Sequence, residues 1–159
     1  MRAVIQRVRS ARVTVEGVST GVIDRGLLVY LGIAPTDGSA EVEWCARKIA
    51  EMRLFPGELG TGAAGRMDRD VGAAGGAVLL VSQFTLYADT RRGRRPAFTD
   101  AAPPDVAAPL VDAVRDALRA RGLRVEEGQF GAHMIVEGEN DGPVTIIIDS
   151  ADRERPRSE

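Results

Sequence analysis

Residues 140–145 (NDGPVT) constrain the fold more than any other stretch of this 159-residue chain. They lead directly into residues 146–148 (III), whose β-branched side chains favour a buried strand. Gly142 is free to adopt a positive φ, whereas Pro143 removes a backbone donor and makes the Gly142–Pro143 bond a candidate cis peptide. Taken alone, this stretch is most simply interpreted as a tight turn into an edge strand.

Length and composition predict one domain over residues 1–150, followed by a charged tail (151–159) that we expect to be disordered. The formal net charge of -2 provides no global positive field, so any RNA contact must come from a local patch. A signal core and a membrane-length apolar run are both absent from the sequence, which predicts a cytoplasmic protein. The single cysteine, Cys45, excludes an internal disulfide and a Cys-based zinc site, and the single histidine, His133, excludes any site that needs two histidines.

Apolar patterning predicts an α/β fold with sheet layers rich in antiparallel strands, arranged like a barrel or sandwich. Strands are expected at residues 2–9, 11–16, 18–23 and 27–33, which would form an antiparallel meander. Later strands are expected near Met67 and at residues 77–81, 123–127, 134–137 and 144–149, and a glycine-rich flexible loop spans 56–76.

Two amphipathic helices are expected to pack together on one face of the sheet layers. The first is capped by Asp37 or Ser39, and Cys45 lies on its buried stripe, which favours a packed thiol over a reactive one. The second opens at residues 103–105 and ends at Gly122. Pro109 must then lie in its first turn, or the regular helix begins only around it.

Residues 91–95 (RRGRR) form the only dense basic cluster in the chain. Such a run is either a solvated surface or a site for anions, because arginine binds planar phosphates well. The sequence leaves both interpretations open.

Conventional catalytic patterns are weak in this chain. Ser82, Thr85 and Thr145 are possible nucleophiles with His133 as base, but no G-x-S-x-G elbow is present, and strand positions would equally make Ser82 and Thr85 structural. The carboxylates are too scattered for a recognisable metal cage, and phosphate-loop motifs are absent. Spacing and composition alone therefore describe a soluble β-rich α/β domain without an evident catalytic side chain.

Residues 82–86 (SQFTL) together with residues 140–145 closely resemble the paired signature of bacterial-type D-aminoacyl-tRNA deacylases. The resemblance covers nearly the whole chain and includes residues 6–8 (QRV), 88–90 (ADT), 92–93 (RG), 95–96 (RP), Phe98 and 128–134 (GQFGAHM).

The resemblance implies a hydrolase that needs no metal or other cofactor and cuts the ester between a D-amino acid and the 3′-terminal adenosine of tRNA. It also implies a symmetric homodimer with active sites at the subunit interface. There, Gly142 and Pro143 form a cis peptide inserted into the partner's pocket, and Arg7 matches the residue that helps to hold this motif across the interface. A rigid wall where an L side chain would point rejects L-substrates by exclusion, but glycine has no Cβ, so glycyl-tRNA is expected to be a substrate too.

The family is thought to use the adenosine 2′-hydroxyl for catalysis, a group that DNA lacks, so neither DNA nor a membrane is an expected partner. The residues that match the family's functional positions are catalytic Ser82, Gln83, Phe84, Thr85 and Thr145, and substrate-binding Arg7, Phe130, Ala132, Met134, Asn140, Gly142 and Pro143. Backbone N–H groups around residues 83–85 would stabilise the oxyanion, and Thr145 is expected to give a hydrogen bond rather than to act as nucleophile.

Two alternatives stay open from the sequence: a non-catalytic tRNA-binding dimer, and a deacylase with a trans Gly-Pro bond that acts on L-aminoacyl esters. The chain departs from the family pattern at residues 57–65, which appear as a longer loop, and at Gly138, which replaces an expected apolar residue. Gly138 could loosen the strand that presents Gly142 and Pro143.

Overall fold

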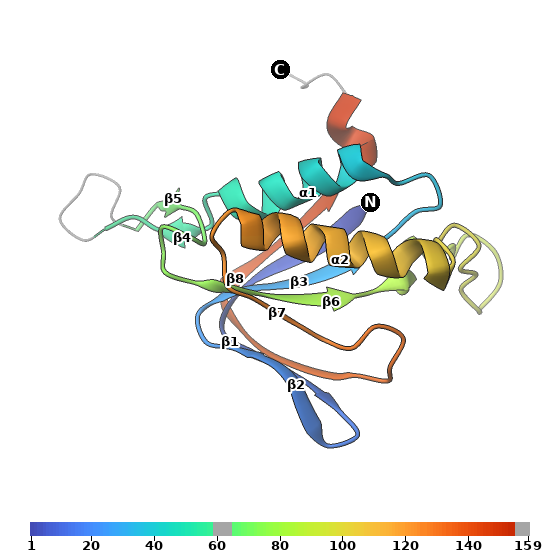
Figure 1. The fold of residues 1–159 in the computed structure, drawn as a ribbon, viewed down its shortest axis with the longest axis horizontal. Coiled ribbons are helices and arrows are strands. Elements are labelled where there is room, and N and C mark those ends of the chain that lie inside the picture. The colour runs from blue at the N-terminus through green and yellow to red at the C-terminus, as the bar shows by residue number, and fades with distance from the viewer. Residues whose placement is uncertain (59–64, 155–159) are drawn as a thin grey trace.

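The computed structural model describes residues 1–58 and 65–154, and this part of the chain is built around a six-stranded mixed sheet (Figure 1). Its strands follow the order β2-β1-β3-β6-β7, with β8 on the other edge of β1. They span Arg2–Val15 (β1), Val18–Ile23 (β2), Gly26–Gly32 (β3), Ala77–Ser82 (β6), Val125–Glu127 (β7) and Ile135–Asp149 (β8).

The sheet combines antiparallel and parallel pairing and curls into a nearly closed barrel. β1 pairs antiparallel with β2, β3 and β8, whereas β3, β6 and β7 run parallel to one another. The backbones of β2 and β7 approach so closely that a Cβ at Gly21 would clash with the carbonyl of Glu127. The expected barrel-like α/β fold is thus confirmed.

The first strand is longer than expected, and the predicted meander is wrong. Residues 2–9 and 11–16 were expected as two strands, but β1 is a single strand of 14 residues. Its first half pairs with β3 and its second half with β2, so β1 lies between them. The exposed pair Arg9 and Ser10 marks a shift in the pairing of β1 with β8, a bulge that bends the strand rather than a turn that ends it.

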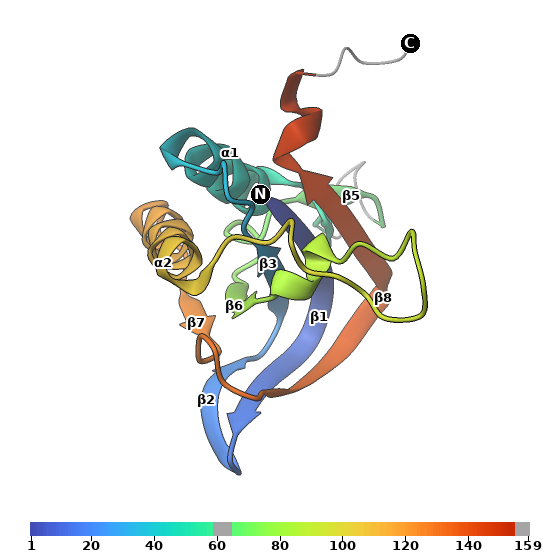
Figure 2. The same cartoon turned by 90° about the vertical axis from the view of Figure 1, so that its right-hand side faces the viewer.

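The last strand also differs from the expectation. Residues 134–137 and 144–149 were expected as separate strands, yet β8 is continuous over 15 residues and runs beside β1 (Figure 2). The run at 146–148 is not fully buried: Ile146 and Ile148 pack against the core, whereas Ile147 is 69% exposed. The run therefore alternates sides, as β-strand geometry requires, and one face of β8 is uncovered in the single chain.

Two helices, α1 (Ser39–Glu51) and α2 (Pro104–Ala120), cover one face of the sheet as expected (Figure 1). Val42, Cys45 and Ile49 from α1 pack in the core, facing a stripe on α2 made of Ala107, Val111, Val114 and Leu118. Burial raises the pKa of the Cys45 thiol to about 12. Cys45 is therefore a packed thiol, in agreement with its position on the predicted stripe.

The first helix differs from the expectation in its N-cap. The second begins where it was expected, with Pro103 as its N-cap and Pro104 as its first residue, and differs only in the position of Pro109. Gly38 is the N-cap of α1, and its N–H donates to the Glu41 carboxylate at 2.9 Å. Asp37 is instead engaged by the N-terminal ammonium of Met1 at 2.6 Å. Pro109 lies inside α2, beyond the first turn, where it is exposed, so water can reach the carbonyl that its missing N–H leaves unbonded. Gly122 ends α2 with a positive φ of 81°, as predicted.

Short elements complete the described chain. β4 (Phe55–Pro56) pairs with β5 (Met67–Arg69), which confirms the brief strand near Met67, while residues 59–64 of the glycine-rich loop lie outside the described residues. Two 3-10 helices, η1 (Phe84–Tyr87) and η2 (Ser150–Glu154), follow β6 and β8. Helix η2 occupies the start of the expected disordered tail, and residues 155–159 lie outside the described part. Within the described ranges, neither helix has the length and apolarity needed to cross a membrane.

Candidate active site

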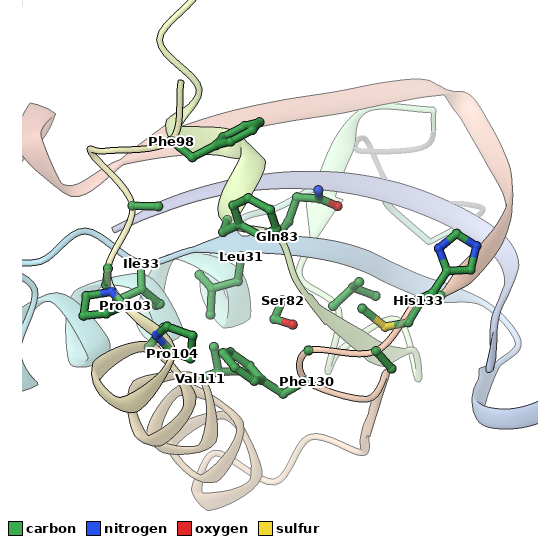
Figure 3. Close-up of a pocket in the computed structure, with 18 of the residues that line it drawn as sticks. Leu31, Ile33, Ser82, Gln83, Phe98, Pro103, Pro104, Val111, Phe130 and His133 are labelled. Atoms are coloured by element: carbon green, nitrogen blue, oxygen red, sulfur yellow. The ribbon is translucent and has the colours of Figure 1, made fainter. Parts of the chain in front are cut away.

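A cavity of about 590 Å³ opens where β6 ends, between η1, the start of α2 and the segment that joins β7 to β8 (Figure 3). Its wall includes six of the residues that the sequence assigned to a site, namely Ser82, Gln83, Phe84, Phe130, Ala132 and Met134. Two segments that are distant in the sequence, 82–86 and 128–134, therefore meet at one cavity.

The buried strand β6 explains why Ser82 and Gln83 reach this place. β6 is apolar and runs parallel to β3 in the middle of the sheet, with residues Ala77 to Val81 buried. The ladder ends where the Gln83 N–H donates to the Leu31 carbonyl at 2.8 Å. Side chains that follow a central parallel strand lie at its carboxyl end, the usual position of ligand sites in parallel sheets.

After Gln83 the chain turns into η1, so Thr85 lies on a 3-10 helix and not on a strand as expected. Phe84 and Thr85 open this helix, and their backbone N–H groups therefore have no acceptor inside it. The Gln83 side-chain amide donates to Thr85 Oγ1, which orients the two side chains. Thr85 itself is exposed and is not among the residues that line the cavity.

Aromatic and apolar side chains dominate the cavity. Phe84 is 59% exposed and Phe130 41% exposed, which is unusual for large apolar residues outside a binding surface. The Phe84 ring meets Phe98 edge to face, with 5.0 Å between centroids. Figure 3 shows Ser82 between Leu31 and Phe130.

Sequence reasoning missed part of this wall. Phe98 belongs to the matched segments, but it received no site role, although it lines the cavity. The apolar contributions of Leu31, Ile33 and Val111 follow from packing between distant elements and have no local sequence signal.

Apart from Thr85, the other predicted site residues form a second group, outside the residues that line the cavity. Gln6 pairs with Thr145 and Val8 with Asn140, so residues 141–144 stand opposite Arg7 alone. These four residues, three more than a regular ladder would place there, form a bulge in β8, which we call the β8 bulge (residues 141–144). Its Gly142–Pro143 peptide bond is cis, in agreement with the resemblance and not with the alternative that requires a trans bond.

Arg7, on the neighbouring strand β1, contacts the β8 bulge. Arg7 is a buried residue, only 9% exposed. Its guanidinium donates to the Asp141 carbonyl at 2.9 Å and to the Leu54 carbonyl at 2.5 Å. Arg7 thus links the bulge of its own chain, through the Asp141 carbonyl, to Leu54 in the segment before β4.

Asn140 closes the base of the same bulge. Its Oδ1 accepts the Val144 N–H at 2.9 Å, and its Nδ2 donates to the Val144 carbonyl at 3.3 Å and to Thr145 Oγ1 at 3.2 Å. Gly142 and Pro143, at the tip, are exposed. The base of the β8 bulge is therefore fixed by hydrogen bonds, whereas its tip is exposed to solvent.

A side-chain triad does not assemble among the described residues. Ser82 and His133 both line the cavity, but no hydrogen bond joins His133 to Ser82, Thr85 or Thr145. The Thr145 hydroxyl is instead in contact with the amides of Asn140 and Gln6, the latter at 3.3 Å. Nor do the described residues contain a group of three or more His, Cys, Asp or Glu side chains placed to hold a metal ion.

Comparison with known proteins identifies a consistent set of relatives. The family model described as D-Tyr-tRNA(Tyr) deacylase matches residues 4–149. A D-aminoacyl-tRNA deacylase of Kineococcus radiotolerans is 60% identical over 151 residues, which cover 94% of this chain and 100% of the relative. One of Chloroflexus aurantiacus is 56% identical over 157 residues, which cover 99% of this chain and 95% of the relative.

Solved structures share the same architecture. The c-Myc DNA Unwinding Element Binding Protein superposes with a TM-score of 0.85 at 38% identity, covering 94% of this chain and 98% of that chain. A probable eukaryotic D-amino acid tRNA deacylase superposes with a TM-score of 0.77, covering 92% of this chain and 97% of that chain. The latter is 19% identical, so its likeness concerns the fold alone.

Proposed function

The chain belongs to the D-Tyr-tRNA(Tyr) deacylase family, and on that premise we propose that it hydrolyses the ester between a D-amino acid and the 3′-terminal adenosine of tRNA. It is a carboxylic-ester hydrolase of the D-aminoacyl-tRNA deacylase type. The observation that carries this proposal is the cavity at the end of β6, which gathers residues from both family segments, 82–86 and 128–134. We further propose that it works in the cytoplasm without a cofactor.

In this proposal the terminal adenosine enters the cavity, which suits it in size and in its aromatic lining. Phe130, Ala132 and Met134 line the adenine side, because apolar and aromatic surfaces accept the face of a base. Ser82 and Gln83 position the nucleotide from the end of β6. The ester carbonyl then lies beside the start of η1.

Catalysis is proposed to depend on backbone groups rather than on a nucleophilic side chain. The unbonded N–H groups of Phe84 and Thr85 face the developing oxyanion, and such preorganised donors commonly supply several kcal/mol of transition-state stabilisation. The 2′-hydroxyl of the adenosine helps to activate water, which adds to the ester carbonyl. The bond to the ribose oxygen breaks, and the free D-amino acid and tRNA are the products.

The active sites are proposed to lie at the interface of a homodimer, with the β8 bulge of one subunit in the cavity of the other. Two observations support this arrangement. The bulge has a fixed base but an exposed tip, and β8 also exposes Ile135 (56%) and Ile147 (69%), which a second copy would cover. The carbonyls of Gly142 and Pro143 then face the chiral centre and exclude an L side chain.

The proposal is tested by incubating the purified protein with D-tyrosyl-tRNA in the presence of a chelator. We expect complete release of D-tyrosine. Binding of tRNA without cleavage would instead support the alternative of a non-catalytic tRNA-binding dimer.

Glycyl-tRNA should also be hydrolysed, because a wall that excludes an L side chain has nothing to exclude in a residue without Cβ. The measurement is release of glycine at the enzyme concentration that clears D-tyrosyl-tRNA. Resistance of the glycyl ester under those conditions would contradict discrimination by exclusion.

Thr145→Ala should retain at least about a tenth of the wild-type rate, since the hydroxyl binds Gln6 and Asn140 at 3.3 and 3.2 Å and serves the β8 bulge. Both hydrogen bonds are exposed, so water can replace the hydroxyl as acceptor, and we expect the two together to be worth no more than about 0.5–1.5 kcal/mol, which is at most about tenfold in rate. Single-turnover kinetics provide the measurement. A loss of about 10⁴-fold would indicate covalent catalysis by Thr145.

A further inference from the structure

The basic segment at residues 91–95 is not used by the proposed chemistry, yet the structure gives it a defined shape and position. Asp89 and Ala97 form an antiparallel bridge with backbone hydrogen bonds of 2.7 and 2.9 Å. We call the closed segment the arginine loop (residues 89–97). Gly93 has a positive φ of 74° and open space around it, so it supplies the turn at the tip.

One of the four arginines of this loop is neutralised internally. Arg91 donates to both carboxylate oxygens of Asp89, at 2.9 and 2.7 Å. These hydrogen bonds lower the pKa of Asp89 to about 2, so Asp89 stays charged at neutral pH. The Asp89–Arg91 pair lies at the base of the loop, and the other three arginines lie at or near its tip.

Arg92, Arg94 and Arg95 are exposed and, within the described part of the chain, no carboxylate pairs with them. Many other arginines of the chain, such as Arg2, Arg115 and Arg124, do have such partners. The tip of the arginine loop therefore concentrates unpaired guanidinium groups on a chain whose net charge is -2. Arginine is suited to phosphate because its planar fork of donors can bind two oxygens at once.

The base of the arginine loop adjoins the cavity. Phe98 follows the bridge directly, lines the cavity and contacts the ring of Phe84. The loop stands at the end of the molecule where α2 begins (Figure 1). Because Gly93 lies midway along the loop, the tip reaches up to about 13 Å from the bridge. If the terminal nucleoside of a nucleic acid fills the cavity, the phosphates that precede this nucleoside would lie within reach of the arginine loop.

We propose that Arg92, Arg94 and Arg95 bind the phosphates of the tRNA nucleotides that precede the terminal adenosine. This inference rests on the proposed function, because it assumes that the adenosine occupies the cavity. Phosphate contacts of this kind fix the register of the RNA and strengthen binding without reading sequence. The loop therefore contributes to KM for tRNA and not to the chemical step.

The test compares wild type with the triple variant Arg92→Gln/Arg94→Gln/Arg95→Gln. A control variant, Arg47→Gln/Lys48→Gln/Arg66→Gln, removes the same charge from three exposed residues elsewhere. We expect kcat/KM for D-tyrosyl-tRNA to fall about 10–100-fold in the loop variant through KM, with kcat within about twofold. The slope of log(kcat/KM) against log[salt] should become shallower by about 2, because each contact with single-stranded RNA contributes about 0.7.

A second substrate separates tRNA binding from catalysis. D-Tyrosyl-adenosine, the ester without the preceding phosphates, should be hydrolysed equally by wild type and the loop variant. An equal loss on both substrates, or a loop variant that matches the control variant, would overturn the inference.

Binding of uncharged tRNA, measured directly, tests the loop even without hydrolysis. The loop variant should bind about 10–100-fold more weakly than the control variant, whereas equal binding would overturn the inference. If wild type leaves D-tyrosyl-tRNA intact, the proposed function fails, and this binding measurement still decides the role of the loop. Weaker binding of duplex DNA with unchanged binding of tRNA would assign the loop to a different partner and also contradict the inference.

Discussion

Gly142→Ala should lower kcat/KM for D-tyrosyl-tRNA by at least about 100-fold. A Cβ at this position would lie 2.7 Å from Val144 Cγ2, 2.9 Å from the Val144 nitrogen and 3.1 Å from the Arg7 guanidinium. Gly142 also has a φ of +145°, which L-residues rarely adopt. The β8 bulge must therefore change shape, and a displacement of about 1 Å at a reacting site can cost about 10²-fold.

Gly17→Ala is a matched control for this experiment. Gly17 also has a positive φ, of +81°, but a Cβ there would meet nothing within 4 Å, and it lies in the turn between β1 and β2. This variant should lose some stability and keep the wild-type rate. Thermal unfolding of both variants checks that they are folded at the assay temperature. If kcat/KM of the Gly142→Ala enzyme is within about threefold of wild type, the β8 bulge is not part of the active site.

Arg7→Met should lower the free energy of unfolding by about 2–5 kcal/mol and reduce activity about tenfold or more where the protein remains folded. Methionine keeps the apolar stem but removes the donor from the buried hydrogen bond to the Leu54 carbonyl and from the partly buried one to the Asp141 carbonyl. A buried group left unsatisfied costs about 1–3 kcal/mol. We expect the loss of activity because the β8 bulge loses its hydrogen bond from Arg7 to the Asp141 carbonyl.

Arg9→Met is the corresponding control. Arg9 also approaches Asp141, at 3.7 Å, but it is 69% exposed, and such pairs are worth about 0–1 kcal/mol. Urea unfolding and single-turnover hydrolysis of both variants measure the difference. Arg7→Lys should not restore the wild-type values, since one ammonium cannot reproduce the two-directional guanidinium contacts. Equal stability of the Arg7→Met and Arg9→Met variants would contradict this role of Arg7.

Local patterns predicted most of the secondary structure and failed where the strands carry bulges. The apolar run of β6 and the amphipathic stripes of the two helices report burial directly, so these elements were predicted correctly. The polar pair Arg9 and Ser10 looked like a strand end, because a bulge and a turn use similar residues. Only the pairing of β1 with its neighbours distinguishes the two.

The site was predictable only in part for a related reason. Composition and spacing contained no catalytic signal, and the family resemblance supplied the residues of both groups. Their spatial separation depends on the register of β8 against β1, in which four residues stand opposite Arg7, and no local rule predicts that register. Phe98 reaches the cavity through the closure of the arginine loop, a contact that follows from tertiary structure.

We propose that this chain removes D-amino acids from tRNA and spares L-amino acids. The decisive measurement is the initial rate of hydrolysis of matched D-tyrosyl- and L-tyrosyl-tRNA, at one enzyme concentration and with chelator present. We expect release of D-tyrosine and an L-tyrosyl ester that decays no faster than in buffer. Cleavage of both esters at similar rates would contradict exclusion by Gly142 and Pro143, and cleavage of neither would contradict the deacylase activity itself.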